Sequence, residues 1–183
     1  SEVGIFSSAF RISVILTFFL GSANAVLAPR FSELFFEKKH NEIEQLAQIS
    51  SFVILIFTLI IFIVTFFNSS YLMSLFGGEF ISGSTSLRIL LLGQVINALC
   101  GSVGIILIMS GNEEYAKKAS FFGALSIVIL SFILIPKFAM IGAAIASTLG
   151  ISFTNFLSYY YVVQKINIYP TYNFNTLKNV YKK

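Results

Sequence analysis

The residues best suited to chemistry in this sequence lie in GQVINALCGSVG at 93–104, inside a run that is otherwise Leu, Ile and Val. If this run is a helix, its small and polar residues share one side: Gly93, Asn97, Gly101 and Gly104. Two interpretations of this stripe stay open. Small residues and amides let membrane helices approach and hydrogen-bond one another, or they line a polar cavity.

Two other apolar stretches carry similar stripes, and a third does not. The first stripe has Ser13, Thr17, Gly21, Asn24 and Ala28. The last has Ala143, Ser147, Thr154 and Ser158, with Gly142, Ala146 and Gly150 alongside. The run SFVILIFTLIIFIVTFF at 51–67 is predicted to face lipid. Packing is the favoured role of the glycines, whereas packing and cavity lining are equal alternatives for Asn24 and Asn97.

The composition indicates an integral membrane protein that is not an enzyme. Hydrophobic residues make up 56% of the 183 residues and charged residues 11%, whereas soluble domains are about a quarter charged. The chain has no Asp, and its one His is His40. Metal hydrolases and His-Asp acyl transferases need side chains that are absent here. We therefore expect no catalytic residue, no metal site and no cofactor.

Five stretches are long and apolar enough to cross a bilayer core of about 30 Å as helices. They lie near 8–28, 50–67, 86–109, 117–135 and 140–162. With the N-terminus outside, nine basic residues are cytoplasmic (Arg30, Lys38, Lys39, Lys117, Lys118, Lys165, Lys178, Lys182, Lys183) and three are outside (Arg11, Arg88, Lys137). This bias predicts a transmembrane lobe over 1–165 and a cytoplasmic tail over 166–183. An odd number of spans predicts at least one more span upstream.

Two connecting segments have predicted structure of their own. After Pro29, which should end or bend the first helix, Asn41 and Glu44 resemble a capping box. We expect a short amphipathic helix there along the cytoplasmic membrane surface, with a solvated linker as the alternative. Outside, a short apolar segment at 71–76 should end at Gly77.

The ionisable residues give the sharpest functional indication. All eight acidic residues are Glu and none lies inside a predicted span, namely Glu2, Glu33, Glu37, Glu42, Glu44, Glu79, Glu113 and Glu114. Cation-coupled pumps usually need an intramembrane carboxylate. Arg11 and Arg88 lie at the outer ends of spans, where each can reach lipid headgroups or contact an anionic substrate.

Three strings resemble the C-terminal half of polysaccharide biosynthesis flippases of the multidrug/oligosaccharidyl-lipid/polysaccharide exporter superfamily. They are NAVLAPRFSELF at 24–35, GQVINALCGSVGIILIMSGNEE at 93–114 and IPKFAMIGAAIAST at 135–148. The resemblance covers about residues 3–165. It implies an all-α polytopic bundle of about five spans, part of the second of two lobes that rock about a central cavity.

The resemblance also implies a function. The protein would move an undecaprenyl-pyrophosphate-linked oligosaccharide across the bacterial cytoplasmic (inner) membrane by alternating access. This oligosaccharide would be a repeat unit of the O-antigen of lipopolysaccharide or of an exopolysaccharide. The predicted substrate-binding residues are Arg11, Asn24, Arg88 and Asn97. The expected partners are this lipid, membrane lipids, the N-terminal lobe and a polysaccharide polymerase or other export machinery, but not nucleic acid. The alternatives are a cation-coupled multidrug exporter of the same fold and a non-transporting membrane scaffold.

Overall fold

The computed structural model describes residues 2–171, and every regular element in that range is a helix. The predicted all-α helix bundle is therefore confirmed. The elements are α1 (Glu2–Phe36), α2 (His40–Phe67), α3 (Ser69–Ser74), the 3-10 helix η1 (Gly78–Gly83), α4 (Ser84–Cys100), α5 (Val103–Met109) and α6 (Glu113–Ile166). Of the predicted cytoplasmic tail, residues 172–183 lie outside the described residues.

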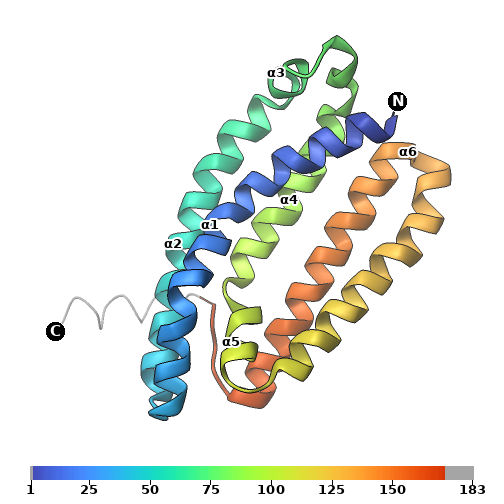
Figure 1. Cartoon of the computed structure of the whole chain (residues 1–183). Coiled ribbons are helices and arrows are strands. Elements are labelled where there is room, and N and C mark those ends of the chain that lie inside the picture. The colour runs from blue at the N-terminus through green and yellow to red at the C-terminus, as the bar shows by residue number, and fades with distance from the viewer. Residues whose placement is uncertain (1, 172–183) are drawn as a thin grey trace.

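The long helices run side by side, and α6 doubles back on itself (Figure 1). Within the described residues four helical segments are long and apolar enough to cross a membrane, and the longest, α6, is two helices joined at a sharp kink. Ala139 forms that kink with φ 48° and ψ −127°. All five predicted ranges fall inside helical segments, with 86–109 divided between α4 and α5. Which segments cross the bilayer stays a prediction.

Glycines join the two legs of α6. A Cβ at Gly142 would collide with the backbone carbonyl of Leu134, and one at Gly123 would collide with the Thr154 hydroxyl. A Cβ at Gly150 would likewise collide with the Ile127 side chain. Because glycine has no side chain, these positions allow the two backbones to approach closely. The packing role predicted for Gly142 and Gly150 is thus confirmed.

Two apolar clusters hold the bundle together, one towards each end. The first joins the end of α1, the start of α2, α5 and the end of α6, with Phe31, Ile43 and Ile106 fully buried. The second joins the start of α1 to α4 and the second leg of α6, with Leu87 and Ala144 fully buried.

The prediction of a short surface helix between the first two spans is wrong. Helix α1 continues through Pro29 to Phe36, and α2 starts at His40, so this segment forms extensions of the two long helices. The residue before α2 is Lys39, which makes no side-chain cap, and Asn41 lies inside the helix. Phe31 and Ile43 explain the difference, because their burial in the first cluster extends both helices.

The turn between α1 and α2 is held by ion pairs outside the apolar part of the helices. Arg30 Nη1 lies 2.6 Å from Glu33 Oε2, and Lys39 Nζ lies 2.9 Å from Glu37 Oε2. The hydrogen bond from Lys39 lowers the pKa of the Glu37 carboxyl and raises the pKa of the ammonium. These groups are exposed, so they fix the shape of the turn more than they stabilise the fold.

The prediction that 51–67 has no small-and-polar face is also wrong. Three hydroxyl residues seven positions apart, Ser51, Thr58 and Thr65, are buried in the bundle. Residues seven apart lie on one side of a helix after about two turns. Helix α2 therefore has a narrow polar seam toward its neighbours, and its remaining surface carries exposed Val, Ile and Phe.

Candidate functional site

Helix α1 has an exposed face of mixed polarity. Ser7, Arg11, Ser22 and Ala25 are exposed and fall within about 60° of one another around the helix axis. Phe18, which is also exposed, interrupts this row, and exposed Val14 and Ile15 lie beside it. Ser7, Arg11, Ser22 and Ala25 are called the α1 open face below. Arg11 makes no ion pair with any residue in the described range.

The outward surfaces of α2 and of the first leg of α6 differ from the α1 open face. On α2 the strongly exposed side chains include Ile60 and Val64, and on α6 they include Phe121, Val128 and Phe132. Apolar surfaces of this kind are suited to lipid hydrocarbon. The Arg11 cation and the serine hydroxyls of the α1 open face are not suited to lipid hydrocarbon, because polar groups without partners are costly there. The α1 open face is thus the best candidate for a hydrated surface.

Asn24 belongs to a different side of α1. Its side chain is half-buried, and its Oδ1 is fully buried without a hydrogen-bond partner in the described part of the chain. Phe31, two turns further along α1, lies on nearly the same side and is buried in the first cluster. The structure therefore places Arg11 and Asn24 on one helix but does not bring them onto one face.

Arg88 ties three elements together. Its Nε donates a hydrogen bond to Ser69 Oγ at 2.7 Å, and its guanidinium carbon lies 5.7 Å from the centre of the Phe66 ring. The side chain is half-buried. These contacts join the start of α4 to the junction of α2 and α3. A role in substrate binding remains a prediction for Arg88, whereas its structural contacts are direct.

The stripe that begins at Gly93 is a packing surface at its first end. A Cβ at Gly93 would lie 3.1 Å from Thr148 Oγ1 on α6, and that hydroxyl donates to the Ile89 carbonyl at 3.0 Å. One turn later Asn97 is half-buried, and its amide donates to Gln94 Oε1 over a long 3.5 Å. The described contacts of Asn97 stay within α4, so its amide does not link two helices.

The predicted continuous helix over 86–109 is broken after Cys100. Gly101 has φ 66° and ψ −142°, a conformation that favours glycine, and α5 begins at Val103. A Cβ at Gly101 would collide with Ser51 Oγ on α2. Because α4 ends at Cys100 and α5 begins at Val103, Gly101 and Gly104 do not continue one helical stripe from Gly93. The space around the Cβ position of Gly104 is open, with nothing within 4 Å.

Several buried polar atoms have no hydrogen-bond partner within the described residues. In the described part of the chain they are Asn24 Oδ1, Ser51 Oγ, Thr58 Oγ1, Ser86 Oγ and Ser102 Oγ. Ser51 and Ser102 lie next to Gly101 in space or in sequence. The last carbonyls of a helix also lack their helical amide partners. The break therefore offers oxygen atoms that can bond water or a neutral polar ligand.

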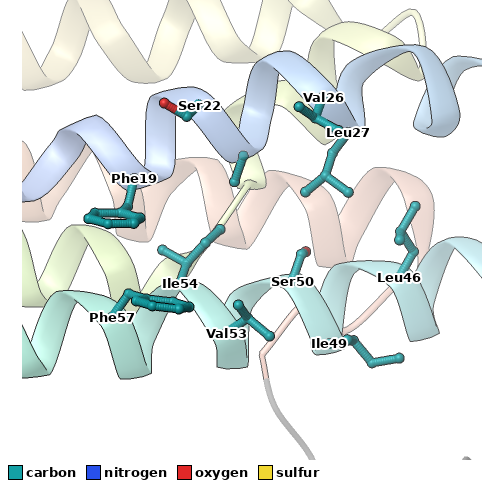
Figure 2. A pocket seen from close by; sticks show the side chains of 11 residues that line it. Phe19, Ser22, Val26, Leu27, Leu46, Ile49, Ser50, Val53, Ile54 and Phe57 are labelled. Carbon is teal, nitrogen blue, oxygen red and sulfur yellow. The ribbon is translucent and has the colours of Figure 1, made fainter.

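A groove of about 470 Å³ runs between α1 and α2 (Figure 2). The Phe19 and Phe57 rings stack across it with their centres 5.2 Å apart. Nearly all of the lining is hydrocarbon: Phe19, Ser22, Ala23, Val26, Leu27, Leu46, Ile49, Ser50, Val53, Ile54 and Phe57. The Ser50 hydroxyl is already bonded to the Ala47 carbonyl. Apart from Ser22, which also belongs to the α1 open face, this groove offers nothing suited to a sugar.

Among residues 2–171 no group of three or more His, Cys, Asp or Glu could hold a metal ion. The acidic residues of that range lie near helix ends, at 2, 33–44, 79 and 113–114. The described chain thus offers cations, hydroxyls and amides near its apolar helices. An all-α bundle with helices of membrane length and these groups is a multi-pass membrane protein.

The chain belongs to the MatE family, whose model matches residues 1–133. This confirms the predicted membership of the multidrug/oligosaccharidyl-lipid/polysaccharide exporter superfamily. Its members are exporters and flippases of the membrane. No solved structure matches the chain significantly.

Three relatives sharpen the comparison. The chain is 31% identical to the capsular polysaccharide biosynthesis protein CapF of Staphylococcus aureus over 165 residues, 90% of this chain and 41% of the relative. It is 25% identical over 171 residues, 92% of this chain and 36% of the relative, to the probable low-salt glycan biosynthesis flippase Agl15 of Haloferax volcanii. An uncharacterized membrane protein of Methanocaldococcus jannaschii, MJ1068, is 30% identical over 74% of this chain and 27% of its own length. The chain spans less than half the length of these curated relatives.

Proposed function

We propose that this chain is part of a flippase that moves a lipid-linked oligosaccharide from the cytoplasmic to the outer leaflet of the bacterial cytoplasmic membrane. The lipid would be an undecaprenyl pyrophosphate, and the movement would follow alternating access with a second lobe. The C-terminus would be cytoplasmic, as the basic residues predict. The protein would make and break no covalent bond.

The α1 open face is the observation that carries this proposal. A pyrophosphate and its sugars need hydroxyls and positive charge along their path, because hydrocarbon offers no hydrogen bonds. Arg11 supplies an exposed cation without an ion pair in the described range, and Ser7 and Ser22 supply hydroxyls on the same face. The names of the CapF and Agl15 relatives, which refer to capsular polysaccharide and glycan biosynthesis, support the same substrate class.

Export of the lipid-linked glycan by Arg11 variants tests the proposal. The full-length protein, with Arg11→Ala or Arg11→Lys, is expressed in a strain that lacks its own flippase, and glycan in the outer leaflet is measured at matched membrane protein levels. We expect Arg11→Ala to lower export at least several-fold and Arg11→Lys to keep part of it, because the lysine retains the charge without the bidentate geometry.

Lys137→Ala is the matched control, since Lys137 is an exposed cation that belongs to α6, beside its kink, and not to the α1 open face. Its export should equal that of the wild type. Wild-type export by Arg11→Ala, or an equal loss in Lys137→Ala, would contradict a specific role of Arg11. Residues 1–183 alone should not restore export, because one lobe cannot enclose a cavity that two lobes share.

A further inference from the structure

Residues 69–83, comprising α3 and η1, form a cap over one end of the bundle (Figure 1). Met73 is fully buried in the second apolar cluster, and Phe80 packs against the same cluster. Four large apolar or aromatic side chains point the other way, with exposed fractions from 44% to 65%: Tyr71, Leu75, Phe76 and Ile81. The 69–83 cap is therefore apolar on its inner and on its outer side.

The position of this cap along α2 sets its depth in a membrane. The stretch 49–67 of α2, which lies between Gln48 and Asn68 and has neither charged nor amide side chains, is about 28 Å long at 1.5 Å per residue. This length matches a hydrocarbon core of about 30 Å. Helix α3 begins at Ser69, just beyond that stretch, so the cap lies at the level of the lipid headgroups.

Specific contacts keep the outward side chains from turning inward. Arg88 Nε donates a hydrogen bond of 2.7 Å to the Oγ of Ser69, the first residue of α3. Gly77, with φ 131°, turns the chain between α3 and η1. Met73 and Phe80 already occupy the inner side. The exposure of Tyr71 and Leu75 is thus built into the cap rather than being a feature of a loose loop.

The outward side chains continue the lipid-facing surface of α2. Ile63, Val64 and Phe67 are more than half exposed in the last turns of α2. Tyr71 and Leu75 follow in α3, with a tyrosine at the depth where aromatic side chains with a polar group are enriched. We propose that the 69–83 cap is an interfacial anchor, with Tyr71, Leu75, Phe76 and Ile81 inserted at the headgroup–acyl boundary of the adjoining leaflet. This inference does not rest on the flippase proposal.

Spin-label accessibility tests the anchor. The full-length protein with Cys100→Ala receives one cysteine at Leu75, Phe76 or Glu79, each labelled with a nitroxide. It is reconstituted in vesicles of phosphatidylethanolamine and phosphatidylglycerol. Relaxation by oxygen, which partitions into lipid, is compared with relaxation by a water-soluble nickel chelate. Glu79 is the matched control, because it is exposed on the same cap and charged.

We expect the ratio of oxygen to nickel accessibility to be several-fold higher at Leu75 and Phe76 than at Glu79. Equal ratios at all three positions would place the cap in water and overturn the proposal. Low accessibility to both reagents at Leu75 and Phe76 would mean that protein covers the cap, and this too would overturn it. Two labelled positions guard against a local failure to fold in either variant.

Discussion

The two ends of the segment 93–104 use small residues in different ways. At the first end Gly93 lies against Thr148, and the Thr148 hydroxyl bonds the Ile89 carbonyl. At the other end Gly101 breaks the helix, and the hydroxyls of Ser51 and Ser102 have no partner among the described residues. The first end is a helix contact whose hydroxyl is hydrogen-bonded. The second end has buried hydroxyls without hydrogen-bond partners in the described range.

This difference separates two roles that a stripe of small residues cannot distinguish. A glycine in a helix contact permits close approach, and its polar neighbours are satisfied across the contact. A glycine with positive φ permits a backbone conformation, and the interrupted helix leaves oxygens for water or ligand. Substitutions at the two ends should therefore fail in different ways.

The largest effect is expected from Gly101→Leu. A side chain there meets Ser51, and the backbone of Gly101, with φ 66° and ψ −142°, is in a region that only glycine adopts readily, which alone costs a non-glycine residue about 1–3 kcal/mol. We expect most of the folded protein to be lost, measured as monodisperse protein in detergent. Gly104→Leu is the control, because the space around Gly104 is open. Similar yields for both variants would show that the break does not depend on Gly101.

Asn97→Leu should affect export more than folding. The amide is half-buried, and within residues 2–171 it makes only one hydrogen bond, a long one within its own helix. Removing it costs little packing, but it removes a polar group near the break. We expect near wild-type melting temperature and a several-fold loss of glycan export in cells. If the variant exports normally, or melts as early as Gly101→Leu, then Asn97 does not serve the transport path.

The smallest effect is expected for single hydroxyls. Thr148→Val keeps the shape but removes the bond to the Ile89 carbonyl, and such bonds between membrane helices average about 0.6 kcal/mol. Ser51→Ala removes a hydroxyl without a partner in the described range, so its stability should be unchanged or slightly higher. Reversible unfolding in mixed micelles compares the two. A larger loss for Ser51→Ala would reveal a bond that the hydroxyl makes with water or another segment.

The sequence predicted the helices well because apolar length is a strong signal. It also predicted close packing at Gly142 and Gly150, where small residues recur every four positions. The break at Gly101 was not predictable in the same way, since glycine inside an apolar run is compatible with a helix. The close approach of Ser51 on another helix, which leaves no room for a Cβ at Gly101, also cannot be seen in the sequence.

The candidate site was predicted less well, for two physical reasons. Three hydroxyl residues scarcely change the mean hydropathy of the apolar run in α2, so they were overlooked. The seven-residue spacing of Ser51, Thr58 and Thr65 was nevertheless a usable signal. The sequence left both Arg11 and Arg88 able to reach headgroups or substrate, whereas the structure gives Arg88 a hydrogen bond and an aromatic contact and leaves Arg11 exposed. Such differences depend on neighbours that are distant in sequence.

The accessibility of Ala25 to water tests the central claim most directly. With Cys100→Ala, a cysteine is placed at Ala25 on the α1 open face or at Val128, which is exposed on the apolar surface of α6. Reaction with a membrane-impermeant, water-soluble thiol reagent is measured in the full-length protein in vesicles, with and without lipid-linked oligosaccharide. If the α1 open face lines the transport path, the Ala25 position reacts, the lipid-linked oligosaccharide slows that reaction, and the Val128 position stays unreactive. An Ala25 position as unreactive as Val128, or one that reacts equally with and without the lipid-linked oligosaccharide, would contradict the account.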